Sequence, residues 1–241
     1  MKNNIILDLL YPKHITCNIC SNDIFEKENN GICSECQKIL PKIVGQVCFR
    51  CGMPIHSIDR YCDLCKKSKP YEMARSCYEY KDNIVTLIHN FKFHNARYLA
   101  EDFAKDLYKL YKEKKYDCDI IVPVPMTESR LKSRGYNQAE LLANELAKLL
   151  NLPVDEQNLL KVKDTKSQVG LDFSKRKNNL LDAFKTKDKK FFKGKKVLIV
   201  DDIFTTGATI ECCAKALKKG LASEVFAITI AHTVKGFDKK D

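Results

Sequence analysis

Short apolar runs alternate with longer amphipathic stretches over residues 71–241 of this 241-residue chain. Val197–Val200 and Ile120–Val124 are continuous runs of β-branched and aliphatic residues, which are typical of strands covered on both faces. Gln138–Leu150 carries leucines at helical spacing, and Val225–Ala231 indicates a final core strand. The pattern predicts an α/β fold, with a mostly parallel sheet flanked by helices.

The stretch Asn83–Tyr111 predicts a helix, a break and then a longer helix. Asn95 is expected to cap the second helix, because asparagine side chains accept hydrogen bonds from the first free N–H groups of a helix. Lys92 lies between Phe91 and Phe93, so its side chain is expected to point away from both rings. It then reaches either a ligand phosphate or the solvent.

Eight of the twelve cysteines form four Cys-x-x-Cys pairs near the start of the chain. Two such pairs complete a tetrahedral Cys₄ site, so the pattern predicts two structural zinc ions. Sequential pairing is favoured over interleaved pairing, because residues 17–36 and 48–65 look like two copies of one unit. Disulfides are disfavoured, since nothing in the chain looks secretory. The predicted ligands are Cys17, Cys20, Cys33, Cys36, Cys48, Cys51, Cys62 and Cys65.

Residues 1–70 hold few large apolar residues for their length, so they are expected to need zinc to fold. The lysine-rich segment Lys66–Tyr71 follows the last cysteine pair and marks a predicted boundary. It divides the chain into a zinc-ribbon domain, residues 1–70, and a second domain, residues 71–241. The apolar run Ile5–Leu10 is too short for a signal core, and no stretch reaches the length of a membrane span. We therefore expect a cytoplasmic protein with reduced thiols.

Two carboxylates and a threonine-rich loop follow the apolar run Val197–Val200. Asp201 and Asp202 come at the predicted carboxyl end of this strand, where ligands bind in open α/β sheets. Gly207 allows a tight turn, and the N–H groups at the next helix start attract an anion. These parts predict a binding site for a phosphorylated, metal-bound sugar, in preference to an ordinary capped turn. The loop residues are Thr205, Thr206, Gly207, Ala208 and Thr209.

A second polar cluster follows the earlier of the two strands. Pro125 constrains the loop, and Arg130 and Arg134 come shortly after it. Guanidinium groups bind phosphate in a bidentate manner, so this turn is interpreted as a pyrophosphate site rather than as an exposed basic turn. Asn137 is then expected to cap the following helix, with Glu140 completing a capping box.

The formal net charge of +11 is concentrated in one segment. Residues 161–196 hold thirteen lysines or arginines against four acids, a net of +9. One interpretation is a site for a nucleic-acid backbone, with Phe191 or Phe192 as a stacking surface. The other, which the segment alone favours, is a solvated lysine-rich loop with both phenylalanines buried in the core.

The stretch from Val197 to Thr209 resembles the 5-phosphoribosyl-1-pyrophosphate (PRPP) motif of type I phosphoribosyltransferases. In that family the acid pair holds the ribose hydroxyls, and the loop wraps the 5-phosphate of Mg²⁺-bound PRPP. The resemblance therefore assigns Asp201 and Asp202 to the ribose and the five loop residues to the phosphate. Purine-salvage members usually carry an aspartate three positions after the acid pair. This chain has Thr205 there, and the departure disfavours purine salvage.

The ordered motifs as a whole resemble the ComF (ComFC) family of phosphoribosyltransferase-like competence proteins. The shared motifs are the four cysteine pairs, Leu-Ile-His-Asn-Phe-Lys-Phe, Val-Pro-Val-Pro, Arg-Gly-Tyr-Asn-Gln-Ala-Glu-Leu-Leu-Ala, Gln168-x-x-Leu171 with Arg176, and the acid-pair motif. The resemblance implies a type I phosphoribosyltransferase-like fold preceded by a double zinc ribbon. It also implies that the protein binds PRPP and handles incoming single-stranded DNA at the cytoplasmic side of the inner membrane. By matching position, a flexible loop spans Val162–Arg176, with Gln168 and Arg176 closing over the ligand.

Two functions follow from these expectations. In the first, the protein is a DNA-uptake factor that uses PRPP as a structural or regulatory ligand and works with membrane-channel and helicase proteins. In the second, it is a catalytic phosphoribosyltransferase of nucleotide metabolism. Asp201 and Asp202 then stabilise a developing ribosyl cation, and pyrophosphate leaves against Arg130 and Arg134. The catalytic interpretation lacks an identifiable acceptor pocket and general base, and an amidophosphoribosyltransferase that uses ammonia ranks lower still.

Overall fold

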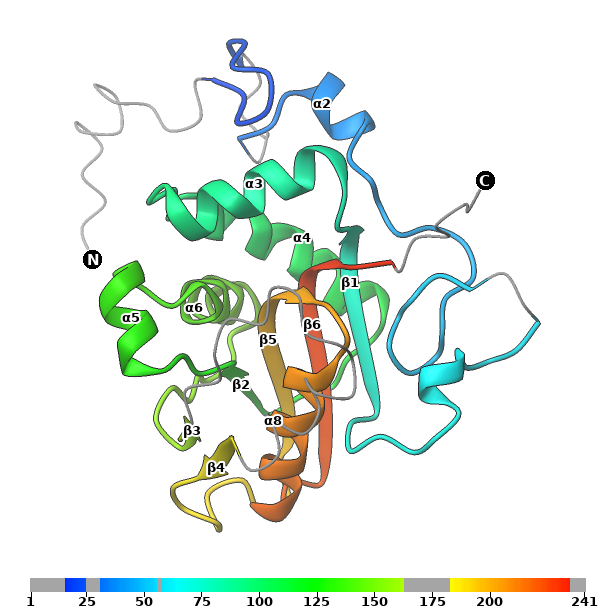
Figure 1. Cartoon of the computed structure of the whole chain (residues 1–241), viewed down its shortest axis with the longest axis vertical. Helices are drawn as coiled ribbons and strands as arrows, with labels where there is room; N and C mark the ends of the chain where they lie inside the picture. Colours follow the sequence, from blue (N-terminus) through cyan, green and yellow to red (C-terminus); the bar gives the residue numbers. More distant parts are fainter. Residues whose placement is uncertain (1–15, 25–30, 56–57, 163–182, 235–241) are drawn as a thin grey trace.

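Four parallel strands form the centre of the molecule, in the order β1-β6-β5-β2. The structure is a computed structural model that describes residues 16–24, 31–55, 58–162 and 183–234 (Figure 1). The strands are β1 (Met73–Glu79), β2 (Ile120–Pro123), β5 (Lys196–Phe204) and β6 (Glu224–His232). The parallel sheet confirms the predicted α/β class.

Helices cover both faces of this sheet (Figure 1). α4 (Leu99–Glu113) and α6 (Gln138–Leu150) pack on one face, and α8 (Ala208–Lys219) packs on the other. α3 (Asp82–Phe93) contacts α4, and the short α5 (Glu128–Arg134) follows β2. None of the described helices combines the length and the apolarity needed to cross a bilayer.

The remaining elements are short. β3 (Leu159–Lys161) and β4 (Phe184–Thr186) form a separate antiparallel pair that contacts α8. The cysteine-rich region contains only one α-helical turn or so among its described residues, α2 (Ser34–Lys38), and the 3₁₀ turn η1 (Asp63–Cys65). So little regular structure is expected where metal ligands, rather than a large apolar core, hold the chain.

The strands of the sheet are apolar on both sides because each side faces a helical layer. On β5, Leu198 and Val200 belong to the buried cluster of α4 and α6, whereas Val197 and Ile199 belong to the cluster of α8. All four side chains are fully buried. Successive residues of a strand point to opposite faces, which explains why the run is continuous rather than alternating.

The ends of the helices test the sequence patterns closely. α6 begins and ends as predicted, and Asn137 Oδ1 accepts from the Ala139 N–H at 3.1 Å. Glu140 contacts the cap in a different way from the predicted capping box, because its Oε1 accepts at 3.0 Å from the side-chain Nδ2 of Asn137. The predicted Asn95 cap is wrong, because α4 begins only at Leu99. Asn95 lies in the connecting turn with a φ of 54°, and its Oδ1 accepts from Arg97 Nε at 2.9 Å.

Candidate zinc sites and phosphate-binding site

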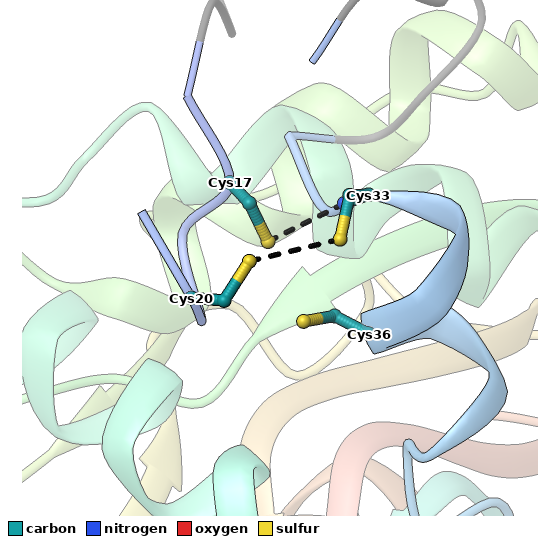
Figure 2. A group of neighbouring side chains, drawn as sticks. All are labelled: Cys17, Cys20, Cys33 and Cys36. Atoms are coloured by element: carbon teal, nitrogen blue, oxygen red, sulfur yellow. Dashed lines mark hydrogen bonds between the residues drawn. The ribbon is translucent and has the colours of Figure 1, made fainter. Parts of the chain in front are cut away.

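The eight cysteines of the four pairs form two groups, which join neighbouring pairs as predicted. Within each group, the sulfur atoms lie within 4.8 Å of one another (Figure 2 shows the first). Cys20 and Cys33 Sγ are 3.8 Å apart, and Cys51 and Cys62 Sγ are 3.7 Å apart. A tetrahedron with Zn–S bonds of about 2.3 Å has edges of about 3.8 Å, so both groups fit zinc. The groups are Cys17, Cys20, Cys33 and Cys36, and Cys48, Cys51, Cys62 and Cys65.

Backbone N–H groups point at sulfur in the same way in both groups. Cys17 Sγ accepts from the Cys33 N–H at 3.3 Å, and Cys48 Sγ accepts from the Cys62 N–H at 3.3 Å. Burial would raise the pKa of Cys17, but backbone N–H groups, including that of Cys33, lower it to about 6. Such hydrogen bonds favour the thiolate, which is the form that binds zinc. Four sulfur ligands leave no open coordination position, so a zinc held here is structural.

β5 carries the acid pair and leads directly into the threonine loop. The strand is longer than the predicted Val197–Val200, because pairing with β6 continues through Asp201 to Phe204. Asp201 and Asp202 therefore lie within the strand, near its carboxyl end. Gly207 precedes α8 with a φ of 76°, and a Cβ there would lie 2.5 Å from the ring of Phe204. This tight turn needs glycine both for its backbone angle and for space.

The start of α8 presents groups of the kind that bind anions. Thr206 Oγ1 accepts from the Ala208 N–H at 3.4 Å, which fixes the hydroxyl against the helix start. Thr205 is exposed, and Thr206 and Thr209 are half-buried. The first N–H groups of any helix lack partners within the helix, and the helix dipole adds a positive potential at the same end. The loop Thr205–Thr209 therefore has the chemistry of a phosphate site.

The two acids differ in their partners. Burial, and then the charge of Asp202, raises the pKa of Asp201 to about 7. The Asp202 N–H donates to Asp201 Oδ1 at 2.9 Å. Lys92 Nζ lies 2.9 Å from Asp202 Oδ2, and only 19% and 14% of these two side chains are exposed. Lys92 therefore points to the acid pair rather than to solvent, and its contact with a ligand phosphate stays a prediction.

A cavity of 380 Å³ opens beside this ion pair and is lined by Lys92, Phe93, Arg130, Ser133 and Arg134. Both arginines are carried by the helix α5, where the sequence suggested only a turn. Arg134 Nη1 donates to Gln138 Oε1 at 2.9 Å, and its guanidinium lies over the ring of Phe93, 4.9 Å from the centroid. Three cations around one cavity suit a ligand with several phosphate charges.

The segment between β2 and α6 is hydrogen-bonded to both β5 and α3. β2 pairs with β5, and the Val124 N–H donates to the Val200 carbonyl at 2.9 Å. Asn137 Nδ2 donates to the Val124 carbonyl at 3.1 Å, and Tyr136 Oη donates to the Phe91 carbonyl. Pro125 comes directly after Val124 in the chain and is half-buried. The loop after β2 and the end of α3 are thus held at the edge of the sheet that bears the acids.

Some predicted residues lie elsewhere. Gln168 and Arg176, with nearly all of the predicted flexible loop, are outside the described residues. Phe192 is fully buried, so the interpretation of it as a core residue is confirmed. Phe191 meets Phe192 edge-on, and Lys195 Nζ lies over its ring, 4.1 Å from the centroid. Phe192 offers no stacking surface, and Phe191 is partly covered.

A basic and aromatic cluster on the second cysteine group was missed by the sequence reasoning. Phe49 is 41% exposed, and the guanidinium of Arg60 lies 3.9 Å from its ring centroid. The ring of Tyr61 lies 6.1 Å from that of Phe49, and Arg50 lies over Tyr61. The signal was present as Phe-Arg inside one cysteine pair and Arg-Tyr just before the next. Only the fold of the ribbon shows that the two dipeptides meet.

Comparisons with known proteins agree with these observations. A family model described as a double zinc ribbon domain matches residues 6–66, and one described as a phosphoribosyl transferase domain matches residues 99–241. Competence protein F of Haemophilus influenzae is 33% identical over 79% of this chain and 85% of its own length. Competence protein ComFC of Bacillus subtilis is 30% identical over 86% of each chain.

DNA utilization protein YhgH of Escherichia coli K12 is 29% identical over 85% of this chain and 91% of its own length. Among solved structures, the glutamine PRPP amidotransferase from B. subtilis is 19% identical, with a TM-score of 0.39, over 58% of this chain and 30% of that chain. Both competence proteins match more than three quarters of this chain. This chain therefore belongs to the ComF (ComFC) family, with a phosphoribosyltransferase fold preceded by a double zinc ribbon.

Proposed function

We propose that this protein binds Mg²⁺–PRPP at the junction of β5 and α8. One observation carries the proposal. The acid pair of β5 and the helix α8, which begins directly after Gly207, lie beside a cavity lined by Lys92, Arg130 and Arg134. Asp201 and Asp202 hold the ribose hydroxyls, and the loop Thr205–Thr209 holds the 5-phosphate. Arg130 and Arg134 face the pyrophosphate, and Pro125 shapes the loop that leads to them.

The remaining contacts follow from charge and from position. Lys92 orients the Asp202 carboxylate through their ion pair before the ligand arrives. The bound Mg²⁺ supplies positive charge to the pyrophosphate. Gln168 and Arg176 are assigned to closure over the ligand by their match to the family pattern alone.

Calorimetric titration of the zinc-loaded protein with Mg²⁺–PRPP tests this site. We expect saturable binding by the wild type and none by the double variant Asp201→Asn with Asp202→Asn. Each substitution removes the negative charge and replaces one acceptor oxygen with an NH₂ donor, so the strong hydrogen bonds to an ionised carboxylate are lost. The variant Asp188→Asn changes one exposed acid outside the site and serves as the control. Unchanged affinity in the double variant would refute the ribose contact.

The raised pKa of Asp201 adds a pH dependence. At pH 6 a carboxyl with a pKa of about 7 is mostly protonated, and at pH 8 it is mostly ionised. If PRPP needs the ionised form, its affinity rises by about tenfold between these values.

The contribution of Asp201 to folding stability changes with pH in the opposite direction. Its folded pKa lies above the unfolded value, so its stabilising effect is complete below about pH 4 and is lost as the pH rises through 7.

We propose further that the protein handles incoming single-stranded DNA during natural transformation, at the cytoplasmic side of the inner membrane and with channel and helicase proteins. The names of its relatives, competence protein and DNA utilization protein, support a role with DNA. The net charge of +11 favours a polyanion. The cluster of Phe49, Arg60 and Tyr61 supplies both a ring for base stacking and cations for phosphate.

The absence of tryptophan from the chain makes this DNA site testable by fluorescence. The variant Phe49→Trp places the only tryptophan of the chain in the cluster, and an oligothymidylate should quench its emission with an affinity that falls steeply with salt. The variant Phe191→Trp reports on the lysine-rich segment in the same way. Quenching only in the second variant would move the DNA site to that segment.

A catalytic phosphoribosyltransferase of nucleotide metabolism is the second candidate. It is favoured by the cavity at Arg130 and Arg134, which could also accept a leaving pyrophosphate. Release of pyrophosphate from PRPP in the presence of free nucleobases or ammonia distinguishes the two functions. Turnover would make PRPP a substrate, whereas binding without release would make it a structural or regulatory ligand.

A further inference from the structure

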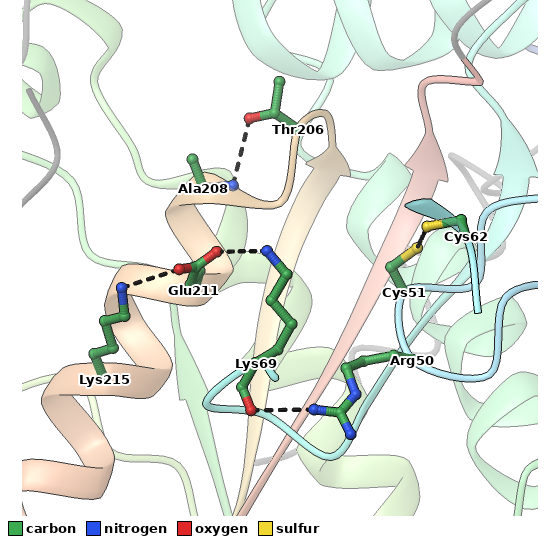
Figure 3. A network of polar contacts seen from close by, with 8 residues as sticks. All are labelled: Arg50, Cys51, Cys62, Lys69, Thr206, Ala208, Glu211 and Lys215. Carbon is green, nitrogen blue, oxygen red and sulfur yellow. Dashed lines mark hydrogen bonds and ion pairs between the residues drawn. The ribbon is translucent and has the colours of Figure 1, made fainter. Parts of the chain in front are cut away.

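A series of polar contacts connects the second cysteine group with the start of α8 (Figure 3). Arg50 lies between the zinc ligands Cys48 and Cys51. Its Nη1 donates to the Lys69 carbonyl at 3.2 Å. Lys69 Nζ in turn pairs with Glu211 Oε2 at 2.9 Å. Two consecutive contacts thus lead from one zinc knuckle to the helix that begins at the phosphate loop.

The pair formed by Lys69 and Glu211 is sheltered from water. The exposed fractions of the two side chains are 16% and 13%, and the residues are 142 positions apart in the sequence. Glu211 Oε1 also accepts from Lys215 Nζ at 2.9 Å. Burial would raise the pKa of Glu211, but hydrogen bonds from the two lysines lower it, so the carboxylate stays ionised. Charges that are shielded from solvent interact more strongly than exposed ones.

Glu211 stands at the position where α8 is connected to the phosphate loop. Its N–H donates to the Gly207 carbonyl at 2.8 Å, which makes this the first hydrogen bond of the helix. A force that fixes Glu211 therefore also fixes where the helix starts and how Thr206 and Gly207 are presented. Apolar packing acts in the same direction, because the second cysteine group shares one buried cluster with Ile210 and other residues of α8.

The first cysteine group has a different environment. Its buried residues Cys17 and Cys36 belong to the cluster of α3, α4 and α6, on the other face of the sheet. Its helix α2 carries the ion pair of Lys38 with Glu35, which joins neighbouring turns of that same helix and is exposed. Among the described contacts, those of the second zinc site lead to α8, whereas those of the first lead to the opposite face of the sheet.

We propose that Lys69 and Glu211 are positioning residues, through which the second zinc ribbon holds the phosphate loop in its binding conformation. This inference rests on the proposed PRPP site. Zinc in the second group would fix the Cys48–Cys51 turn, which carries Arg50. The Arg50 guanidinium then orients the Lys69 backbone through its carbonyl, and the Lys69 side chain fixes α8 through Glu211. By thermodynamic linkage, bound PRPP in turn helps the second group to retain its metal.

The test compares PRPP affinities of zinc-loaded variants by calorimetry. Lys69→Met keeps the apolar stem but removes the charge, and we expect about tenfold weaker binding. Lys69→Arg restores a cation and most of the affinity. The double variant of Lys69→Met with Glu211→Gln should bind PRPP as tightly as the weaker-binding of the two single variants, since both substitutions break the same pair. The control Lys38→Met removes the exposed pair of the first ribbon and should leave the affinity unchanged.

A second readout is hydrogen exchange across residues 203–212, with zinc content and far-UV circular dichroism measured on the same samples. Lys69→Met should keep both zinc ions and exchange these amides faster than Lys38→Met does. If Lys69→Met binds PRPP within twofold of the wild type, the positioning role is overturned. If the wild type binds no PRPP, the proposed PRPP site is wrong. The exchange data alone then decide, because equal exchange in the two variants refutes the link between ribbon and loop.

Discussion

The two cysteine groups share one local geometry and differ in what surrounds it. In both, the first cysteine donates its N–H to a carbonyl five residues ahead, at 2.7 Å for Cys17 and 2.8 Å for Cys48. The residue after the second cysteine has a positive φ in both, 61° at Ser21 and 75° at Gly52. All four cysteines of the second group are buried, whereas Cys20 of the first is exposed. The local sequence therefore determines the knuckle, and tertiary packing determines its burial.

The second ribbon is joined to the sheet by backbone and side-chain hydrogen bonds. The Ala74 N–H donates to the Arg50 carbonyl at 2.7 Å, and the buried Arg75 donates from Nη2 to the Phe49 carbonyl at 3.0 Å. Its cysteines lie in the same buried cluster as strands β5 and β6 and helix α8. The same metal motif therefore lies wholly within the hydrophobic core in the second group, whereas in the first group only Cys17 and Cys36 are buried in a cluster.

The largest predicted difference concerns loss of one ligand from each site. Cys51→Ser should release the second zinc and open the buried cluster, at a cost of about 4 kcal/mol or more. For a chain of this size that lowers Tm by about 10 °C. Cys20→Ser, at the matched position of the first site, should release one zinc but keep the main thermal transition. Calorimetry with zinc analysis checks both, and equal losses of Tm would contradict the comparison.

The next prediction concerns the residue that follows the knuckle. A Cβ at Gly52 would lie 2.9 Å from the Ala74 carbonyl oxygen, and the backbone angle there already disfavours a side chain. Gly52→Ala should therefore destabilise the protein by about 2–3 kcal/mol. Ser21 already carries a side chain at the matched position, so Ser21→Ala should change the stability by less than about 0.5 kcal/mol. Denaturant unfolding of both variants measures the difference, and similar midpoints would mean that the second ribbon packs less tightly.

The parts of the structure that the sequence predicted have local causes. The helix Gln138–Leu150 has its exact predicted ends because leucine spacing and the Asn137 cap mark them within the helix itself. The zinc pairing followed from a visible repeat of two similar units. The fold class followed from apolar runs that any two-sided sheet requires.

The parts that could not be predicted depend on tertiary packing. The pairs of Lys92 with Asp202 and of Lys69 with Glu211 join distant elements, and their partners are set by how helices and linkers pack on the sheet. No periodicity encodes such a pairing. The domain boundary near residue 70 stays a prediction. Residues on both sides of it, such as Cys65 and Ala74, share one buried cluster.

A smaller predicted effect is the order of zinc release. A chelator reaches the exposed Cys20 directly, whereas the second site must first open a buried cluster. We expect two kinetic phases of one zinc each, with the first at least about tenfold faster. Release followed with a coloured zinc indicator measures the phases, and prior removal of the first zinc through Cys20→Ser should abolish the fast one. Two indistinguishable phases in the wild type would show that burial does not protect the second metal.

The smallest predicted effect separates two lysine–glutamate pairs by stability alone. Lys69→Met leaves Glu211 half-buried without its sheltered lysine partner, while Lys215 Nζ stays 2.9 Å away, and should cost about 1–2 kcal/mol. Lys38→Met removes the pair of Lys38 and Glu35 from the surface of α2, where water and salt screen both charges, and should leave the unfolding midpoint unchanged. Unfolding at low and high salt tests the cause. Added salt should weaken the wild type's advantage over Lys69→Met only slightly, because the pair is sheltered. A large salt effect would mean that solvent reaches Glu211, and the second ribbon would then hold α8 by apolar packing alone.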